Sequence, residues 1–338
     1  MSKHPGVLGW HWPILGPSRC GASTDRERLG LPECYVAHEI QAAVSQACKA
    51  LRREPLDALL ETLASVETPL PARVASGDLL ARAGDPRIIV ERPVMVDVPG
   101  GAVDIGLDAR EVASVVNRFG GLGIERAWIE KECPRHRVEL LAYRIARFPV
   151  TNLEYRAFVI DTDHSELPSS WHFRQFPEER ANHPVYTISA ASADAYVRWL
   201  AQRTARGFRL PSEAEWEHAA AGPNETEFPW GGQFDPALAN TAETGLFSTS
   251  AVGAFVGGES AYGLCDMAGN VEEYVADEYS AYPGGALVVD HLARTGGYRV
   301  ARGGSFARFR DLARTRRRHG HNPVSATYAM GFRLAESP

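Results

Sequence analysis

Arginine and aromatic side chains are concentrated near the C-terminus. Between Arg302 and Arg318 there are seven arginines and one acid, Asp311; this segment carries +6, and the rest of the chain −6 − 6 = −12. Guanidinium groups pair with carboxylates or phosphates, and aromatic rings add rigid contact area. We therefore predict that this segment binds a protein or an anionic small molecule. The predicted contact residues are Phe306, Arg308, Phe309, Arg310, Asp311, Arg316, Arg317, His319, His321 and Tyr328.

A second group of residues has the pattern of a cation site. Residues 266–273 (DMAGNVEE) alternate carboxylates with positions whose carbonyl groups can turn inward, and Gly269 permits the bend. Calcium takes about six to eight oxygen ligands from carboxylates and carbonyls. A polar turn whose carboxylates cap backbone groups is the alternative interpretation.

The cysteine and histidine residues give weaker indications of a functional site. Five widely spaced cysteines, with none after Cys265 and no C-x2-4-C pair, are typical of free thiols in a reducing cytoplasm. His4, His11 and His38 precede the predicted helices without an H-x3-H pair. An iron site built from three histidines in one loop is an alternative that we keep open, although loop histidines are more often solvated or hydrogen-bonded. The three are His164, His172 and His183.

Bulk properties exclude several classes of protein. A net charge of −6 gives no general case for binding nucleic acid or an anionic membrane. No apolar run approaches the roughly 18 residues that span a bilayer, and the proline-broken N-terminus makes a poor signal peptide. We expect a cytoplasmic protein. A length of 338 residues suggests two domains, or one large domain with an appendage.

The elements that must position these residues change in character along the chain. Residues 39–51, 55–65 and 74–83 have apolar residues three and four apart, which predicts a small helical segment within 1–90. Strand patterns follow at 95–105, around a Pro-Gly-Gly turn, and at 137–147. Capping boxes at Thr151 and Ser212 predict helix starts, and a third helix is expected over 190–204. Beyond Gly222 the sequence predicts mostly loops.

Short motifs in a fixed order identify a family resemblance. The motifs occur at 98–101 (VPGG), 132–136 (ECPRH), 148–152 (FPVTN), 209–217 (RLPSEAEWE), 228–231 (FPWG), 262–273 (YGLCDMAGNVEE), 300–305 (VARGGS) and 331–333 (GFR). This order resembles the formylglycine-generating enzyme, or sulfatase-modifying factor, family. The resemblance implies an α+β, loop-rich, C-type-lectin-like domain over 94–338, preceded by the helical segment.

The resemblance also implies metal positions. The family binds structural calcium at positions that match Asp266, Gly269, Val271 and Glu273, and Asn240 and Thr241 match half of its second calcium site. The oxidase members bind copper through two cysteines, and the matching positions here are Arg308 and Ala313. Copper is therefore not expected, since Cu(I) prefers thiolate ligands.

Some relatives in this lectin-like group are binding proteins, including the variable proteins of diversity-generating retroelements. Their variable cassette runs from a Gly-Gly-Ser-aromatic motif to Gly-Phe-Arg, as residues 303–333 do here. Residues 303–329 contain no Lys, Glu, Gln, Met or Trp, the residues that adenine randomisation of an asparagine codon cannot produce. We expect a non-oxidase binding protein, with a divergent iron- or copper-dependent oxidoreductase as the alternative. A third possibility is a scaffold whose helical segment docks onto a larger complex.

Overall fold

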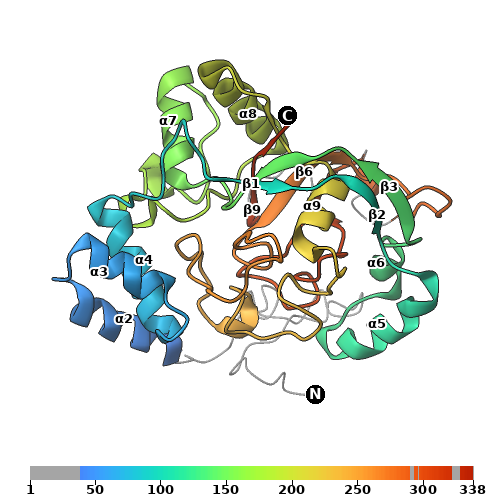
Figure 1. The fold of residues 1–338 in the computed structure, drawn as a ribbon, viewed down its shortest axis with the longest axis horizontal. Helices are drawn as coiled ribbons and strands as arrows, with labels where there is room; N and C mark the ends of the chain where they lie inside the picture. Colours follow the sequence, from blue (N-terminus) through green and yellow to red (C-terminus); the bar gives the residue numbers. More distant parts are fainter. Residues whose placement is uncertain (1–38, 290–292, 296, 322–327, 338) are drawn as a thin grey trace, which may run out of the picture.

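Three helices form a layer at one side of the molecule (Figure 1). The computed structural model describes residues 39–289, 293–295, 297–321 and 328–337, and the three helices are α2 (Glu39–Leu51), α3 (Leu56–Ala64) and α4 (Leu70–Ala83). All three lie where helices were predicted, but α4 begins earlier than expected. Its first turn contains a proline, which a helix tolerates there because the first amide groups have no helical partner.

This helical layer is docked on the rest of the chain. A Cβ added to Gly77 in α4 would lie 2.4 Å from the Cβ of Ala251, so the helix approaches that loop closely. The Asn182 side chain donates to the Gly77 carbonyl at 3.0 Å and to Asp85 at 2.7 Å. Within the described chain, the helical layer therefore packs against the segments that carry Asn182 and Ala251.

Three small sheets make up the β structure. The first has the order β1-β4-β10-β5, the second pairs β2 with β3, and the third has the order β8-β7-β6-β9. The strands are β1 (Met95–Val98), β2 (Gly101–Ile105), β3 (His136–Leu140), β4 (Tyr143–Ala146), β5 (Phe208–Arg209), β6 (Glu272–Glu278), β7 (Arg299–Arg302), β8 (His319–Gly320), β9 (Met330–Phe332) and β10 (Ala335–Glu336).

Strand pairing differs from the simplest interpretation of the sequence. β1 and β2 flank the predicted Pro-Gly-Gly turn, but β1 pairs with β4 and β2 with β3. The single strand predicted over 137–147 is likewise divided between two sheets, as β3 and β4. The apolar alternation changes phase at Leu140 and Leu141, where the chain passes from one sheet to the other.

The remaining helices surround the sheets, and the described residues after 221 contain hardly any helix, as expected. The longer ones are α5 (Val112–Phe119), α6 (Arg126–Glu130), α7 (Asn152–Thr162), α8 (Ala190–Thr204) and α9 (Glu213–Ala221). Short 3₁₀ turns are η1 (Ala109–Glu111), η2 (Gly120–Leu122), η3 (His172–Arg174), η4 (Glu178–Arg180), η5 (Ala242–Thr244) and η6 (Ala293–Thr295). The predicted capping boxes of α7 and α9 are both formed. α5 and α6 were not predicted.

The third sheet places the C-terminal segment over one strand. β6 lies between β7 and β9, with Glu273 opposite Arg302 on one side and Gly331 on the other. Glu272 is opposite Met330, and β8 extends the sheet beyond β7. The two glutamates at the start of β6 are therefore enclosed by the two ends of the segment 302–335.

Candidate functional site

The C-terminal cassette, residues 302–335, begins with a turn that only glycine accommodates easily. Gly303 and Gly304 have φ angles of 93° and 69°, in the left-handed region that L side chains rarely adopt. A Cβ on Gly304 would lie 2.9 Å from the carbonyl carbon of Leu312. The turn thus brings the start of the cassette against the loop that carries its arginines.

Most arginines of the cassette belong to a buried network of ion pairs. Arg314 donates to both carboxylate oxygens of Glu132 at 2.9 and 2.8 Å, and Arg318 donates to both oxygens of Glu213 at 2.7 and 2.8 Å. Arg333 makes the same double contact with Glu273, 2.6 Å at each oxygen. These arginines stabilise the framework, because a buried guanidinium requires such partners.

The positive charge of the cassette is neutralised within the chain. All seven arginines from 302 to 318 have a carboxylate oxygen within 4.0 Å. The carboxylates in these pairs come mostly from distant parts of the sequence. Those parts carry the remaining net charge of −12. The local excess of arginine is therefore paired with carboxylates of the same chain, and an anionic ligand stays a prediction.

Three of the ten predicted contact residues are buried. Phe309 packs in an apolar cluster with Phe119 and Phe228. Arg317 donates to the carbonyl oxygens of Trp128 and Arg318 at 3.2 and 2.7 Å. Asp311 is also buried, and burial raises its pKa. We correct the prediction for these three residues, because none of them faces solvent.

Two further predicted contact residues, Arg310 and Arg316, are partly exposed at the rim of the cassette. Arg310 pairs with Glu243 at 3.2 Å, and Arg316 lies 3.6 Å from Glu225. Pairs of this kind contribute little to stability, about 0–1 kcal/mol. Their side chains remain available for contact with a partner.

The other predicted residues gather around a buried carboxylate that the sequence did not single out. Oε2 of Glu272 lies 2.5 Å from Nδ1 of His319, and Oε1 lies 3.8 Å from Nε of Arg308. Arg308 also stacks over the ring of Tyr328, 4.4 Å from its centroid, and His321 stacks on the same ring at 4.8 Å. We call these five residues the Glu272 cluster.

Electrostatics fix the charges of this cluster. Burial opposes ionisation of Glu272, but His319 and the nearby arginines hold its pKa below the usual range. Burial lowers the pKa of His319, with an opposing contribution from Glu272, and burial lowers that of His321 as well. Burial and the neighbouring charges therefore shift all three of these groups toward the deprotonated form.

Three buried polar atoms of the cluster have no hydrogen-bond partner within the described chain. They are Oε1 of Glu272, the hydroxyl of Tyr328 and Nε2 of His321. Buried polar groups are nearly always paired, so three such atoms in one cluster indicate a place where a ligand can bind. Beside the cluster, the ring of Phe306 meets Tyr186 edge-on at 5.6 Å.

The two carboxylates predicted to bind calcium, Asp266 and Glu273, lie close together but have different hydrogen-bond partners. Asp266 is only partly exposed; desolvation of its carboxyl raises the pKa to about 6, and the charge of Glu273 adds to that effect. Both oxygens of Glu273 accept from Arg333, and Oε2 also accepts from Trp216 at 2.7 Å. Protein donors thus already engage both oxygens of Glu273, and its role as a calcium ligand stays a prediction.

The other predicted calcium ligands fit a cation better. Oδ1 of Asn240 is buried without a hydrogen-bond partner in the described chain, and Asn240 is bridged to Gly269. Asn270 connects the side chains of Asn240 and Asp266 at 3.4 and 3.3 Å. Thr241 instead donates to Glu243, and Val271 is buried. A calcium site near Asn240, Asp266 and Gly269 stays a prediction.

The loop histidines that could have formed an iron site lie apart. Nε2 of His164 contacts Ser192 at 2.8 Å, whereas His183 lies between Thr249 and Asp78, both at 3.1 Å. His172 is exposed. In the described ranges, no group of three or more His, Cys, Asp or Glu side chains is arranged to hold a metal ion. His4, His11 and His38 lie outside those ranges.

Cysteine positions give no thiolate pair in the described chain. Cys48, Cys133 and Cys265 are free thiols, and burial raises the pKa of the last two to about 11. Of the two positions that resemble the copper-binding cysteines, Arg308 belongs to the Glu272 cluster and Ala313 is fully buried.

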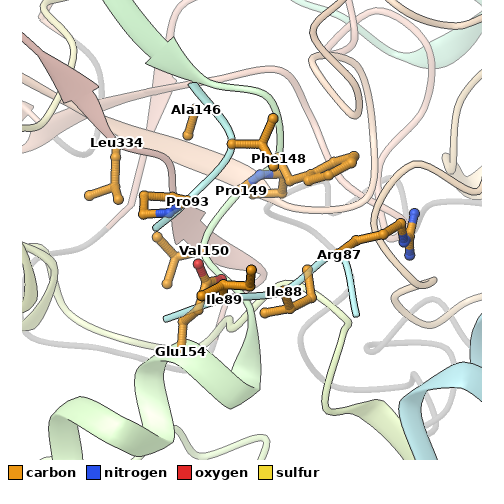
Figure 2. A pocket seen from close by; sticks show the side chains of 11 residues that line it. Arg87, Ile88, Ile89, Pro93, Ala146, Phe148, Pro149, Val150, Glu154 and Leu334 are labelled. Carbon is orange, nitrogen blue, oxygen red and sulfur yellow. The ribbon is translucent and has the colours of Figure 1, made fainter. Parts of the chain in front are cut away.

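A small cavity lies where β4 meets α7, and Leu334, near the end of the cassette, lines one side of it (Figure 2). Its volume is about 10 Å³, close to the room needed by one water molecule. Glu154 lines it and completes the capping box with Thr151, and burial raises its pKa to about 7. The cavity is too small for a substrate.

No helix of the described chain is long and apolar enough to cross a membrane.

Comparison with known proteins gives consistent matches. The family described as "Sulfatase-modifying factor enzyme 1-like domain" matches residues 84–338. Formylglycine-generating enzyme of Streptomyces coelicolor is 30% identical, covering 80% of this chain and 96% of the relative. "Inactive C-alpha-formylglycine-generating enzyme 2" of Mus musculus is 31% identical over 72% and 86% of the two chains. Hercynine oxygenase of Mycolicibacterium smegmatis is 30% identical over 70% of this chain, but the match spans only 60% of that relative.

Solved structures resemble this fold as well. PvdO from Pseudomonas aeruginosa matches with a TM-score of 0.56 and 26% identity, covering 73% of this chain and 95% of PvdO. Treponema denticola variable protein 1 matches with a TM-score of 0.54 and 22% identity, over 72% and 95% of the two chains. The α+β fold predicted from the short motifs is thereby confirmed.

Proposed function

Because the chain belongs to the sulfatase-modifying factor enzyme 1-like domain family, we propose that it is a non-oxidase member that binds a protein or a small molecule through its C-terminal cassette. The Glu272 cluster is the centre of the proposed site, and Phe306, Arg310 and Arg316 lie on its rim. The similarity to a relative named as inactive supports a member without oxidase activity.

One observation carries the proposal. Arg308 occupies a position that resembles a copper-binding cysteine of the oxidases, and its guanidinium stacks over Tyr328 and faces Glu272 at 3.8 Å. A guanidinium has five donors and no lone pair to offer a metal, so it serves recognition through hydrogen bonds and stacking. The replacement thus exchanges a metal ligand for a recognition group.

The chemistry of the ligand follows from the atoms that lack partners. Oε1 of Glu272 is an acceptor, the Tyr328 hydroxyl can donate or accept, and Nε2 of His321 depends on its tautomer. The arginines are already neutralised by carboxylates. We therefore favour a ligand with amide or hydroxyl groups, in a peptide or a small molecule, over one selected for negative charge alone.

A metal-dependent oxidoreductase is the second candidate. His319 and His321, two residues apart, lie near Glu272, and two imidazoles with a carboxylate are a common iron ligand set. Relatives named as formylglycine-generating enzyme and hercynine oxygenase favour it. Nδ1 of His319 already contacts Glu272, and these three side chains do not form a metal-binding group in the described structure. This geometry makes it the weaker candidate.

Diversification of the cassette is a separate proposal. The likeness to the variable protein concerns the fold alone at 22% identity. Burial of Phe309, Asp311 and Arg317 leaves the exposed rim as the part of the cassette that tolerates variation. A template repeat and a reverse transcriptase gene beside the coding sequence would support diversification, and their absence would refute it. A cytoplasmic location also stays a prediction.

Thermal unfolding in the presence of amides, hydroxylated compounds, carboxylates and short peptides tests the binding proposal. A ligand at about 100 times its Kd raises the free energy of unfolding by about 2.7 kcal/mol. Such a shift should disappear in Arg308→Ala and His319→Ala and persist in Arg135→Ala, an arginine outside the cassette. A shift that survives in the two cassette variants would contradict the proposed site.

A further inference from the structure

Phe173 is the most exposed large hydrophobic side chain of the described chain, with 95% of its surface accessible. Its backbone is unusual, because Phe173 and Arg174 have φ angles of 56° and 61°. Bulky residues rarely adopt this left-handed conformation, and it persists only where the surroundings impose it. An aromatic ring held in solvent on a strained turn suggests a contact residue.

The turn is anchored on both sides. The indole of buried Trp171 donates to Asn152 at 2.8 Å, and its ring meets Phe176 edge-on at 5.4 Å. Phe176 is in turn covered by the guanidinium of Arg156 at 4.6 Å. Phe173 is therefore presented by a rigid base, which lowers the entropy lost when such a group binds.

An open groove lies on the same part of the fold, between the C-terminal end of α7 and the outer face of α8. It has a volume of about 280 Å³ and is lined by Phe158, Thr162, His164, Ala195, Arg198 and Trp199. Small-molecule sites usually occupy roughly 300–1,000 Å³ and enclose their ligand. An open aromatic groove of this size suits a single inserted side chain.

The two features are complementary in charge as well as in shape. Arg174 is exposed directly beside Phe173, and Asp163 is exposed between the groove residues Thr162 and His164. Figure 1 shows α7 and α8 together at one edge of the molecule, where a second molecule has access to both. A two-fold contact requires that each copy supply both the inserted group and the groove that receives it, and this chain carries both.

We propose that the chain forms a closed dimer in which Phe173 of each copy inserts into the α7–α8 groove of the other. Arg174 of each copy then lies near Asp163 of its partner. The occupant of the groove is thus a second copy of this chain. This interface is independent of the cassette, so the proposed ligand site and the dimer can fail separately.

Sedimentation velocity of the full chain from about 1 to 100 µM tests the proposal. We expect a reversible monomer–dimer equilibrium, and Phe173→Ala should weaken it by at least roughly 30-fold, the effect of losing a buried aromatic anchor. Leu141→Ala is the matched control, because Leu141 is also an exposed apolar residue, at 84%, but lies between β3 and β4. It should leave the equilibrium unchanged.

Charge reversal supplies an internal check. Arg174→Asp and Asp163→Arg should each weaken the dimer, and the double variant should recover most of the loss, which a folding defect would not do. A monomer at every concentration, an open-ended series of oligomers, or a dimer equally stable in Phe173→Ala would overturn the proposal. Loss of the dimer in Leu141→Ala or failure of the double variant would overturn it too.

Discussion

Nδ1 of His319 lies 2.5 Å from Oε2 of Glu272, a carboxylate with no exposed surface. One residue comes from the cassette and the other from the start of β6, so this contact fastens the proposed binding surface to the sheet beneath it. Because a buried ionised carboxylate requires hydrogen-bond donors, the contact is also important for stability.

Replacing His319 should expose this dependence. His319→Ala leaves Oε2 of Glu272 without its donor, and we expect a loss of about 2–3 kcal/mol in the free energy of unfolding at pH 7. Folding lowers the pKa of both groups, so the unfolded chain binds more protons and the contribution of the pair is lost as pH falls below about 6.5. Urea unfolding at pH 7 and pH 4.5 measures this. A difference between variant and wild type that grows at pH 4.5 would contradict the account.

Glu154 should show the opposite pH dependence. Burial raises its pKa from 4.5 to about 7, so between these values the folded protein holds a proton that the unfolded chain releases. Stability from this group is therefore present below about pH 4.5 and lost as pH rises through 7. Glu154→Gln mimics the protonated form and keeps an acceptor for Thr151. We expect it to stabilise the protein by about 1–3 kcal/mol at pH 8 and hardly at all at pH 4.5. Equal effects at both values would refute the assignment.

Arginines two positions apart in the cassette should differ greatly in their contribution. Arg314 is buried against Glu132 and Glu227, and its replacement by Met removes the main partner of the buried Glu132 carboxylate, whereas Glu227 keeps its pair with Arg118. We expect Arg314→Met to cost about 3–5 kcal/mol. Arg316→Met is the matched control, since Arg316 only borders Glu225 at 3.6 Å, and it should cost less than about 1 kcal/mol. Similar losses in chemical denaturation would contradict the buried network.

The effect of calcium on Tm can be measured separately from that of the neighbouring Glu273–Arg333 ion pair. If calcium binds near Asn240 and Asp266, saturating calcium should raise Tm relative to a chelator, and Asp266→Asn should remove that shift. Glu273→Gln should lower Tm equally with and without calcium, because Glu273 serves Arg333 and Trp216. A calcium shift that is lost in Glu273→Gln and kept in Asp266→Asn would contradict this expectation and identify Glu273 as a calcium ligand.

Helices whose first residues form a capping motif could be predicted from the sequence. The capping boxes at Thr151 and Ser212 mark α7 and α9, because their hydrogen bonds join residues three positions apart. α5 was missed although Val112, Val115 and Phe119 form an apolar face, since no capping side chain marks its start. The two consecutive leucines at 140 and 141 interrupt the apolar alternation, but the sheet that each strand joins is decided by distant partners.

The candidate site was predicted in location but only partly in composition. The arginines were visible as a cluster, yet Glu132 is 182 residues from Arg314, and such pairings cannot be read from spacing. Their burial could not be predicted for the same reason. Glu272 was overlooked because the motif resemblance gave a role to its neighbour Glu273. A second carboxylate adjacent to a motif position was the signal available.

Metal content of the purified full chain distinguishes a binding protein from an oxidoreductase. We expect no stoichiometric iron or copper, in the wild type or in His319→Ala, and no oxygen uptake. About one equivalent of iron or copper in the wild type, lost in His319→Ala and accompanied by oxygen uptake, would contradict this expectation and establish the oxidoreductase instead.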